Sequence, residues 1–441
     1  MTDIKRLNFF DRSVLFLLLA LFVSIVMVVS FFFPTIYVWI VLNALVLFGV
    51  LIYLVIFLGN KSAGRAVAPK SFPSISIIVP CFNSKGTIRA CIDSIKKLKY
   101  PKKFEIIVVD DCSTDGSREL LEKISGITLI KLKKNSGNSV ARNTGLARAK
   151  SEFVVYIDSD SYPEEDLFYK TLGYFEDKSV GAVTCLILPD KNKTVIQKIQ
   201  YFEYLSSFGM NNSLLSSINS SYVVPGPMTI FRKSVFSKVG EFTPGILAED
   251  MDWGLRLKKH GLKIMSCVDA VVLTDVPSTW RGLFKQRDRW YRGGTYNFIT
   301  HKSLMFNKTN KDFGFFVMPF LFFTQILTIA LIMRIILYFF VDLYNFVSIY
   351  ANFLLLGGKI SLDFSGLVIP PSLTFFALTY CIIALYFFIS FWFAQRGPFL
   401  RDLPALVMLI FIYPYFVTFT YSQSYFKEMF GVRARWLRVS T

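Results

Sequence analysis

Histidine is nearly absent from this chain of 441 residues. The two that occur, His260 and His301, stand beside none of the motifs described below, which leaves little material for a zinc site or a histidine-based triad. The six cysteines form no Cys-x-x-Cys pair and no metal-ligand spacing, so we expect reduced, structural thiols. They are Cys81, Cys91, Cys112, Cys185, Cys267 and Cys381.

Charge is also scarce, and acidic residues are the scarcer kind. Only 18% of the residues are charged, with 31 acidic against 49 basic side chains and a formal net charge of +18. A basic chain can bind nucleic acid, but no nucleic-acid module is recognisable and many basic residues flank apolar segments, where anionic headgroups attract them. With 53% hydrophobic residues, the composition indicates a membrane protein with one globular domain and no nucleic-acid partner.

Two long apolar runs open the chain. Residues 14–33 and 36–58 contain no charge, and each reaches the roughly 20 residues that span a bilayer, so residues 1–60 are predicted to form a transmembrane hairpin. The first run is longer than the roughly 7–15 residues of a signal peptide core. Basic residues on both flanks place the N-terminus and the following domain in the cytoplasm. They are Lys5, Arg6 and Arg12 before the hairpin, and Lys61, Arg65 and Lys70 after it.

Short β-branched runs alternate with helical patterns between residues 72 and 306. Such alternation predicts an α/β domain whose mostly parallel sheet is covered by helices on both faces. Ligands of such sheets bind beyond the carboxyl ends of the strands, where Asn83, Asp111 and Asp160 fall. The expected strands are residues 75–79, 104–109, 127–132 and 153–157, and the first expected helix is residues 87–98.

Two acidic motifs follow strand ends, and a third opens a helix. Asp111 is either a ligand-binding carboxylate or, like Asp115, a turn and cap residue. Asp158 and Asp160 can hold Mg²⁺ or Mn²⁺ while pyrophosphate oxygens complete the metal shell, although Asp-x-Asp is frequent by chance. Asp250, after Glu249, can deprotonate an acceptor hydroxyl group, or it can be the N-cap of the helix that starts there.

A fourth motif, residues 286–290, joins an amide, two guanidinium groups and an indole. Arg289 can bind phosphate oxygens in a bidentate manner, and Trp290 can stack on a sugar ring. Alternatively, the segment is a basic, aromatic helix at a membrane interface. Four such motifs in series, between transmembrane segments, indicate a nucleotide-sugar site.

With this series of motifs, residues 74 to about 306 resemble an inverting family 2 glycosyltransferase of the GT-A fold. The layout is similar to that of the membrane synthases of cellulose, chitin, hyaluronan and poly-N-acetylglucosamine, the last being nearest in size. The resemblance implies that Asp111 binds the nucleobase beside a turn from Pro80 to Asn83. It also implies that Asp158 and Asp160 hold the diphosphate through the metal.

The same resemblance implies roles on the acceptor side. It makes Asp250 the general base, and it assigns Gln286, Arg289 and Trp290 to the pyrophosphate and the terminal acceptor sugar. Glu249 is placed on the acceptor side with Trp290.

The chain departs from the family pattern at two places. Ala248 stands where a Thr usually precedes the acidic pair. Gly137-Asn138 stands where many processive members have Gly-Lys, and this difference argues against processive elongation. It also makes Arg142 a candidate for the phosphate contact.

The C-terminal part, residues 307–424, is predicted to hold further membrane helices. Residues 315–340, 371–393 and 403–421 can cross, and residues 341–358 are a further span, a re-entrant piece or a surface helix. Arg334 lies within the first span and either snorkels or lines a polar path. The basic tail, residues 425–441, favours a cytoplasmic end and therefore four crossings.

The resulting hypothesis is a multi-pass enzyme of the cell membrane that uses a nucleotide sugar, preferably UDP-linked, from the cytoplasm. It forms β-linkages and elongates a polysaccharide that it exports through its own helices. Single-sugar transfer to a lipid is the alternative, and a non-catalytic channel or binding subunit is a third. The partners are the donor, a growing glycan or lipid acceptor and membrane lipids, with an accessory membrane subunit left open. Residues 201–208, with Glu203, are expected to form an interfacial helix.

Overall fold

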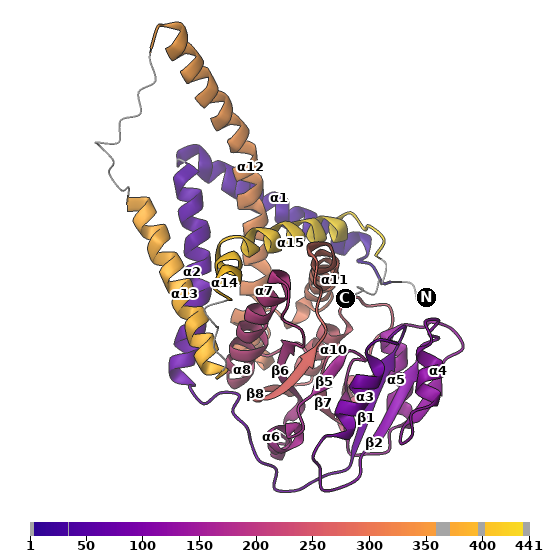
Figure 1. The fold of residues 1–441 in the computed structure, drawn as a ribbon. Helices are drawn as coiled ribbons and strands as arrows, with labels where there is room; N and C mark the ends of the chain where they lie inside the picture. Colours follow the sequence, from indigo (N-terminus) through magenta and orange to yellow (C-terminus); the bar gives the residue numbers. More distant parts are fainter. Residues whose placement is uncertain (1–3, 34, 359–370, 396–401, 435–441) are drawn as a thin grey trace.

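The computed structural model describes residues 4–33, 35–358, 371–395 and 402–434. A sheet with helices on both faces forms one part of the molecule, and long helices extend from it (Figure 1). The strand order is β3-β2-β1-β4-β7-β6-β8-β5. The α/β fold expected from the alternation of strands and helices is therefore confirmed.

The first four strands pair in parallel and match the expected segments. Nearly all residues of β1, β2 and β4 are buried, because helices cover both sides of this half of the sheet. The strands are β1 (Ile75–Cys81), β2 (Glu105–Asp110), β3 (Thr128–Lys131) and β4 (Phe153–Tyr156).

The second half of the sheet is mixed, which the sequence patterns did not indicate. β7 lies antiparallel between β4 and β6, and the short β5 pairs antiparallel with β8. The parallel half follows from strand-helix alternation, whereas these pairings connect segments far apart in the chain. The four strands are β5 (Ser161–Pro163), β6 (Val180–Pro189), β7 (Thr229–Arg232) and β8 (Lys263–Thr274).

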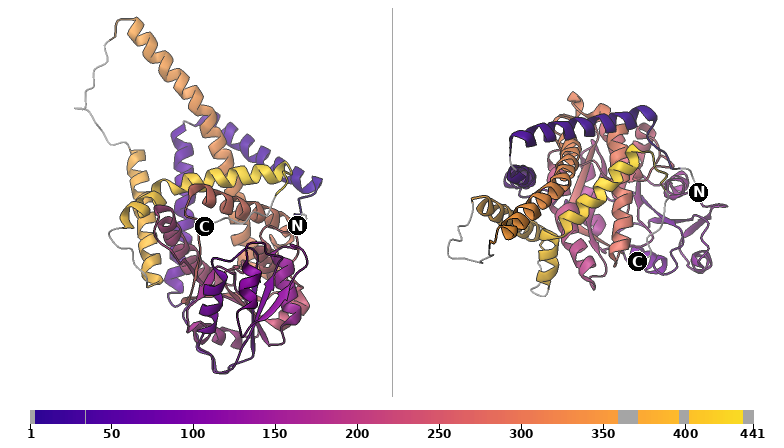
Figure 2. Two further views of the ribbon diagram at one scale, coloured as in Figure 1. Left: turned by 45° about the vertical axis from the view of Figure 1, so that its right-hand side comes forward. Right: turned by 90° about the horizontal axis from the view of Figure 1, so that it is seen from above.

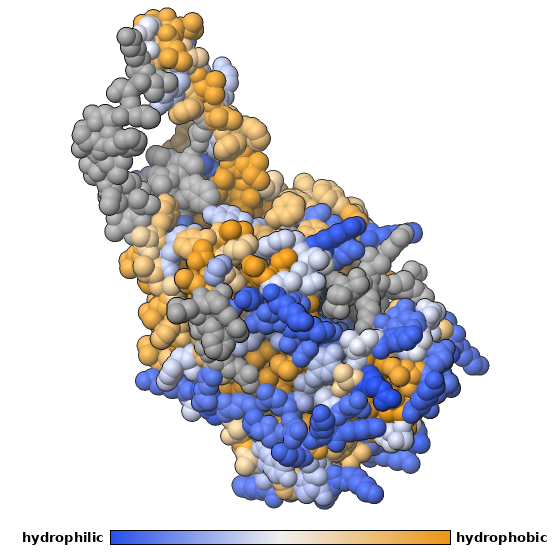
Figure 3. Space-filling view, viewed as in Figure 1, coloured by the Kyte–Doolittle hydropathy of each residue, from blue (hydrophilic) through white to orange (hydrophobic). Residues whose placement is uncertain are grey.

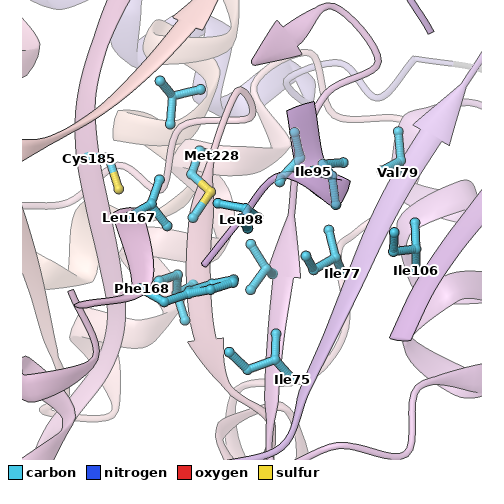
Figure 4. Close-up of a cluster of buried hydrophobic side chains, with 14 of the residues drawn as sticks. Ile75, Ile77, Val79, Ile95, Leu98, Ile106, Leu167, Phe168, Cys185 and Met228 are labelled. Carbon is cyan, nitrogen blue, oxygen red and sulfur yellow. The ribbon is translucent and has the colours of Figure 1, made fainter. Parts of the chain in front are cut away.

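Alternate residues of β1 pack into two different cores. Ile75, Ile77 and Val79 join the cluster under the helices that follow β1 and β5, shown in Figure 4, whereas Ile78 packs on the opposite side. The covering helices are α3 (Ile88–Lys96), α4 (Ser117–Glu122) and α6 (Leu167–Thr171) on the first side, and α5 (Asn138–Arg148), α9 (Phe236–Val239) and α10 (Glu249–Lys259) on the second.

Four helices are long and apolar enough to cross a membrane within the described residues. Their hydrophobic surface contrasts with the hydrophilic surface of the sheet domain (Figure 3). Both helices of the expected N-terminal hairpin are present. The four are α1 (Phe9–Phe32), α2 (Thr35–Gly59), α12 (Met318–Leu355) and α13 (Pro371–Phe393).

The C-terminal helices differ from the expectation of four crossings. Residues 341–355 are not a separate element but continue α12, which has 38 residues. Residues 403–421 are not one continuous helix, because α14 (Leu403–Phe411) and α15 (Tyr413–Met429) meet at an angle of 45°. The described residues after the domain thus contain two spanning helices, or three if the bent pair is one span. Of the expected tail, residues 435–441 lie outside the described residues.

Three helices connect the sheet domain to the membrane-type helices. They are α7 (Val195–Tyr204), α8 (Asn212–Ser217) and α11 (Trp280–Thr300). α11 packs along α15, and α7 packs against α14 (Figures 1 and 2). Residues 201–208, expected at an interface, lie in this packed layer, where Phe202 and Leu205 are buried.

Arg334 of α12 does not snorkel. Its side chain is buried, Nε donates to Ser30 Oγ of α1 at 3.0 Å, and the guanidinium lies over the Tyr338 ring. The arginine therefore links α1 to α12. All six cysteines are free thiols, as expected, and Cys381 of α13 is exposed.

Candidate active site

One cavity of about 820 Å³ lies at the carboxyl ends of the first strands and reaches α11, α12 and α15. All of the predicted site residues line it. They are Pro80, Asn83, Asp111, Arg142, Asp158, Asp160, Glu249, Asp250, Gln286, Arg289 and Trp290. The motifs are spread over more than 200 positions of the chain, and the fold gathers them around a single space.

Asp111 holds the loop that precedes α5. Its two carboxylate oxygens accept hydrogen bonds from the backbone N–H groups of Ser136 (2.7 Å) and Gly137 (2.8 Å). Burial raises the pKa of Asp111, and these two N–H donors oppose that rise. Asp111 is thus not a cap of α4, so the cap alternative is wrong for this residue. Asp115 is a turn residue just before the N-cap Gly116 of α4, and its carboxylate accepts from the backbone N–H of Ser117 at 3.0 Å.

Asn83 ties the loop after β1 to the loop after β2. Its backbone has a positive φ of 50°, a conformation that asparagine tolerates better than most residues. Its side-chain oxygen accepts from the Thr114 N–H at 2.8 Å, and its own N–H donates to Ser113 Oγ at 3.0 Å. The two strand-end loops therefore form one rigid wall of the cavity.

Arg142 lies beneath the carboxylates. It is buried on α5, and its guanidinium contacts Asp158 at 3.0 Å and Glu249 at 3.3 Å. The ring of Phe242 lies 5.3 Å from the guanidinium carbon. Although burial opposes the charged form, these carboxylates raise the pKa of Arg142. A permanent positive charge therefore holds two acidic motifs together.

Gly226 approaches these groups so closely that no side chain fits there. A Cβ atom at this position would lie 2.6 Å from Asp158 Oδ2 and 2.7 Å from an Arg142 nitrogen. The segment Pro225-Gly226-Pro227 lines the cavity. Gly226 was not predicted as a site residue, although a glycine between two prolines could have indicated a close approach of the backbone.

Asp158 and Asp160 fit a magnesium or manganese ion. Both are half-buried and line the cavity, and Asp275 joins them there, its backbone N–H donating to the Asp160 carbonyl at 3.1 Å. The described residues hold no cluster of three or more metal-ligating side chains. Mg²⁺ commonly takes one or two carboxylates and completes its shell with water and substrate phosphates, which matches this donor set. Asp275 was not predicted from the sequence to line this cavity.

Glu249 is buried and holds two neighbouring side chains of the site. It is 5% exposed, and Oε1 accepts from Asn138 Nδ2 at 2.8 Å in addition to its contact with Arg142. Asn138, at the position where many processive members have Lys, thereby binds the first acidic residue of the Glu-Asp pair. The sequence reading did not foresee this bond.

Asp250 lies in the first turn of α10, and its N-cap residue is Ala248, so the N-cap alternative for Asp250 is wrong. Burial, with a further contribution from neighbouring Glu249, raises the pKa of Asp250 to about 6. The nearby cations Arg142 and Arg289, and the Met251 N–H, oppose this shift. A carboxyl group with a pKa near neutrality is suited to accept a proton.

Different faces of α11 touch different parts of the molecule. Gln286, Trp290 and Gly294, spaced by four residues, line the cavity. Asn297 and His301, on another face, bind α10: Asn297 donates to the Ala248 carbonyl at 2.9 Å, and His301 Nε2 lies 2.8 Å from Asp252 Oδ1. His301 thus contacts the helix that carries Asp250, although the two residues lie far apart in sequence.

Arg287 anchors α11 to α7 and α15. It is fully buried, and it pairs with Glu203 at 2.5 Å and donates to the Tyr413 hydroxyl at 3.2 Å. Its guanidinium carbon lies 4.1 Å from the Trp290 ring centre. Residues 286–290 thus lie between the cavity and the layer of helices formed by α7 and α15.

Comparison with known proteins agrees with this geometry. Residues 76–240 match the model of glycosyl transferase family 2. The poly-beta-1,6-N-acetyl-D-glucosamine synthase of Staphylococcus aureus (strain MSSA476) is 30% identical over 273 residues, which is 60% of this chain and 64% of the relative. The synthase of the same name from Staphylococcus epidermidis is 31% identical over 251 residues, or 54% of this chain and 60% of the relative. Each match thus spans less than two-thirds of the relative's length.

A solved structure has the same fold. It is a mannosyltransferase from Pyrobaculum calidifontis in complex with GDP-Man and Mn²⁺, with a TM-score of 0.58 and 21% identity, covering 90% of this chain and 100% of that one. At this identity the likeness concerns the fold alone. Residues 76–240 are thus similar to glycosyl transferase family 2, and the described fold is that of a solved mannosyltransferase.

Proposed function

We propose that this chain is a membrane-embedded inverting glycosyltransferase that takes a nucleotide sugar, preferably UDP-linked, and elongates a β-linked polysaccharide. The observation that carries the proposal is the position of Asp250: a half-buried carboxyl group with a pKa of about 6 in the same cavity as Asp158, Asp160 and Trp290. The relatives named as poly-beta-1,6-N-acetyl-D-glucosamine synthases make UDP-N-acetylglucosamine the first donor to test.

In this proposal Asp250 accepts the proton of an acceptor hydroxyl group. The acceptor oxygen then bonds to the anomeric carbon from the face opposite the diphosphate, and the bond between that carbon and the leaving oxygen breaks, which inverts the configuration. Asp111 binds the base, Arg289 binds pyrophosphate oxygens, and Trp290 stacks on the terminal acceptor sugar. Asp158 and Asp160 would hold a divalent ion, which would supply charge neutralisation for the departing diphosphate.

The remaining parts of the proposal concern location. The four apolar helices and the positive flanks of the N-terminal hairpin support a multi-pass protein of the cell membrane with its catalytic domain in the cytoplasm, where nucleotide sugars are made. Membrane lipids and an acceptor glycan are then its partners, and an accessory membrane subunit remains compatible with this arrangement.

The test is nucleotide release by the detergent-purified chain with Mg²⁺ or Mn²⁺ and a panel of UDP- and GDP-sugars. We expect metal-dependent release with one donor, and a loss of at least 100-fold in Asp250→Asn, the scale of a general base. Asp93→Asn, an exposed carboxyl group on α3, serves as the matched control and retains activity. Equal release by wild type and Asp250→Asn contradicts the proposed base.

Single-sugar transfer to a lipid is the second candidate. It is favoured by one observation, because Asn138 stands where many processive members have Lys and is engaged by Glu249. Product size separates the two: a ladder of glycan lengths supports elongation, and one lipid-linked product supports single transfer.

A further inference from the structure

The stretch of chain before α1 reaches the active-site cavity. We call residues 4–8 the N-terminal strap. They form no helix or strand, and the side of the cavity that they reach includes Ile4 in its lining. Gly245 and Ile246, which shortly precede Asp250, line the same cavity. A segment that leads into a membrane-type helix is therefore also part of the wall around the proposed general base.

A backbone hydrogen bond holds the strap to residues 240–248, the loop between α9 and α10. The N–H of Lys5 donates to the Gly245 carbonyl at 2.7 Å. Gly245 has a positive φ of 82°, a conformation that favours glycine, so the loop turns sharply where it presents this carbonyl. The Lys5 side chain is exposed, and the bond therefore depends on the backbone of the strap and not on its charge.

An apolar side chain supplies the second attachment of the strap. Leu7 is 5% exposed and belongs to the same buried cluster as Ala248 and Met251. These two residues flank the Glu249-Asp250 pair in the chain. The strap is thus fixed both to the loop before Asp250 and to the core in which the first turn of α10 is embedded.

The other end of the strap is held more firmly. Asn8 is the N-cap of α1, and its side chain accepts from the Asp11 N–H at 2.8 Å. Asp11 pairs with Lys302 at 2.7 Å, and the Tyr425 hydroxyl of α15 donates to the Leu15 carbonyl of α1 at 2.8 Å. The first turns of α1 are therefore a fixed base, from which the strap can swing away when its two attachments at the cavity break.

Closure at this place has a chemical consequence. An Asp250 carboxylate can accept a proton from water as well as from a sugar hydroxyl group. Attack by water would release the donor sugar without transferring it, so a transferase must exclude water from this end of the cavity. The side chains of Ile4 and Ile246 are apolar and offer water no hydrogen bond in this wall.

We propose that the N-terminal strap is a lid on the cavity beside Asp250, with the start of α1 as its hinge. This inference rests on the proposed function, because it takes Asp250 as the general base. With the strap closed, the loop before Asp250 is held and water is kept out. With the strap open, the oxygen of a water molecule bonds to the anomeric carbon, one of its protons passes to Asp250, and the bond to the diphosphate breaks.

The test loosens each attachment of the strap in the full chain. Lys5→Pro removes the N–H donor, whereas its control Lys5→Ala keeps the N–H and loses the same exposed side chain. Leu7→Ala removes the apolar attachment, and Leu17→Ala, exposed on α1, is its control. With UDP-N-acetylglucosamine and β-1,6-linked N-acetylglucosamine oligomers, we expect the ratio of free to transferred sugar to rise about fivefold in Lys5→Pro, the effect of one hydrogen bond, and at least as much in Leu7→Ala. An unchanged ratio in both variants, or an equal rise in their controls, overturns the lid.

Hydrogen exchange separates a failure of this inference from a failure of the proposed function. It is measured by mass spectrometry on the full chain in detergent, without donor or acceptor, and protection of the β1 amides verifies that each variant is folded. We expect the amides of residues 243–252 to exchange about fivefold faster in Lys5→Pro than in Lys5→Ala, and faster in Leu7→Ala than in Leu17→Ala, because local opening becomes easier. This result supports the lid even if wild type transfers no sugar. Equal exchange within both pairs overturns it, whatever the activity.

Discussion

At the scale of single residues, the proton affinity of Asp250 sets the pH range in which the proposed reaction can run. The carboxyl group must be ionised to accept a proton, and burial together with Glu249 raises its pKa to about 6. We expect kcat/KM to fall about tenfold per pH unit well below pH 6, because the protonated fraction grows by that factor. A pH–rate profile between pH 4.5 and 8 measures this limb, and a limb near pH 4 contradicts the assignment.

Glu249 offers a sharper version of the same test. Glu249→Gln removes the negative charge that helps to raise the Asp250 pKa. We therefore expect the acid limb of the profile to move to lower pH, even if the maximal rate also drops. A limb that stays in place indicates that the titrating group is not Asp250.

Gly226 makes a steric prediction about metal and donor binding. The Cβ of Gly226→Ala would lie 2.6 Å from Asp158 Oδ2, so either the Pro225-Gly226-Pro227 segment or the carboxylate must move. We expect Mn²⁺-dependent binding of the donor to weaken about tenfold or more, measured by calorimetry, since small displacements of positioning groups have large effects. Gly59→Ala, at the end of α2 where a Cβ meets no atom within 4 Å, is the control.

The chemistry of single residues was more predictable than their contacts. Residue type, position and the resemblance to a known family together selected eleven side chains, and all of them line one cavity even though α10 and α11 lie far from β1 in sequence. The partners of these residues were not predictable. Asp111 binds backbone groups of residues 136 and 137, and Arg142 joins two motifs, because such pairings depend on how loops approach in three dimensions.

At the scale of elements, α11 positions the N-terminus of α10 and with it Asp250. A Cβ at Gly293 would lie 2.5 Å from the Ala248 Cβ and 2.8 Å from its backbone nitrogen. We expect Gly293→Ala to reduce the free energy of unfolding by about 1–3 kcal/mol through overpacking and to lower kcat more than it raises the donor KM. Thermal unfolding and steady-state kinetics of the same preparation test both effects, with Thr300→Ala on the same helix as control.

The contact of α11 with α7 depends on a buried ion pair. Arg287→Leu leaves the partly buried Glu203 carboxylate without its cation, and we expect a loss of about 3 kcal/mol in unfolding free energy. The double variant Arg287→Leu, Glu203→Leu should lose less than Arg287→Leu alone, because no unpaired charge remains. Chemical unfolding of the three variants measures the coupling. Equal losses in the single and double variants contradict it.

Element boundaries were predictable where local signals suffice. The strands of the parallel half follow from β-branched runs that end at polar loops, and the apolar helices follow from their length. The course of α12 was not predictable, because residues 341–355 carry enough polar side chains to resemble a separate piece although the helix continues. Nor does composition reveal the bend between α14 and α15. After this bend, α15 packs along α11.

At the scale of the whole molecule, the sheet domain and the helical part share their hydrophobic cores. One cluster joins Leu186 of β6 to Phe391 of α13, and another joins Met251 of α10 to Phe313 and Tyr425. The polar pairs Asp288–Lys427 and Arg292–Glu428 tie α11 to α15 as well. The predicted domain of residues 72–306 is therefore not expected to be independent of the rest.

A fragment of residues 72–306 tests this expectation. Removing the other segments exposes the domain side of both clusters, and such large apolar patches cause association. We expect the fragment to aggregate in detergent-free buffer or to unfold at a lower temperature than the full chain in detergent. Size-exclusion chromatography and thermal unfolding measure this. A monomeric fragment as stable as the full chain shows that the shared clusters contribute little.

The exposure of Cys381 has a practical consequence. Of the six free thiols, four are buried and Cys112 is half-buried, so only α13 presents an exposed sulfur in the described structure. A lipid-soluble thiol reagent should therefore reach Cys381 of α13, whereas a water-soluble one should react first at the half-buried Cys112. One spin label or fluorophore can then report on the depth of this helix in a lipid bilayer without any engineered substitution.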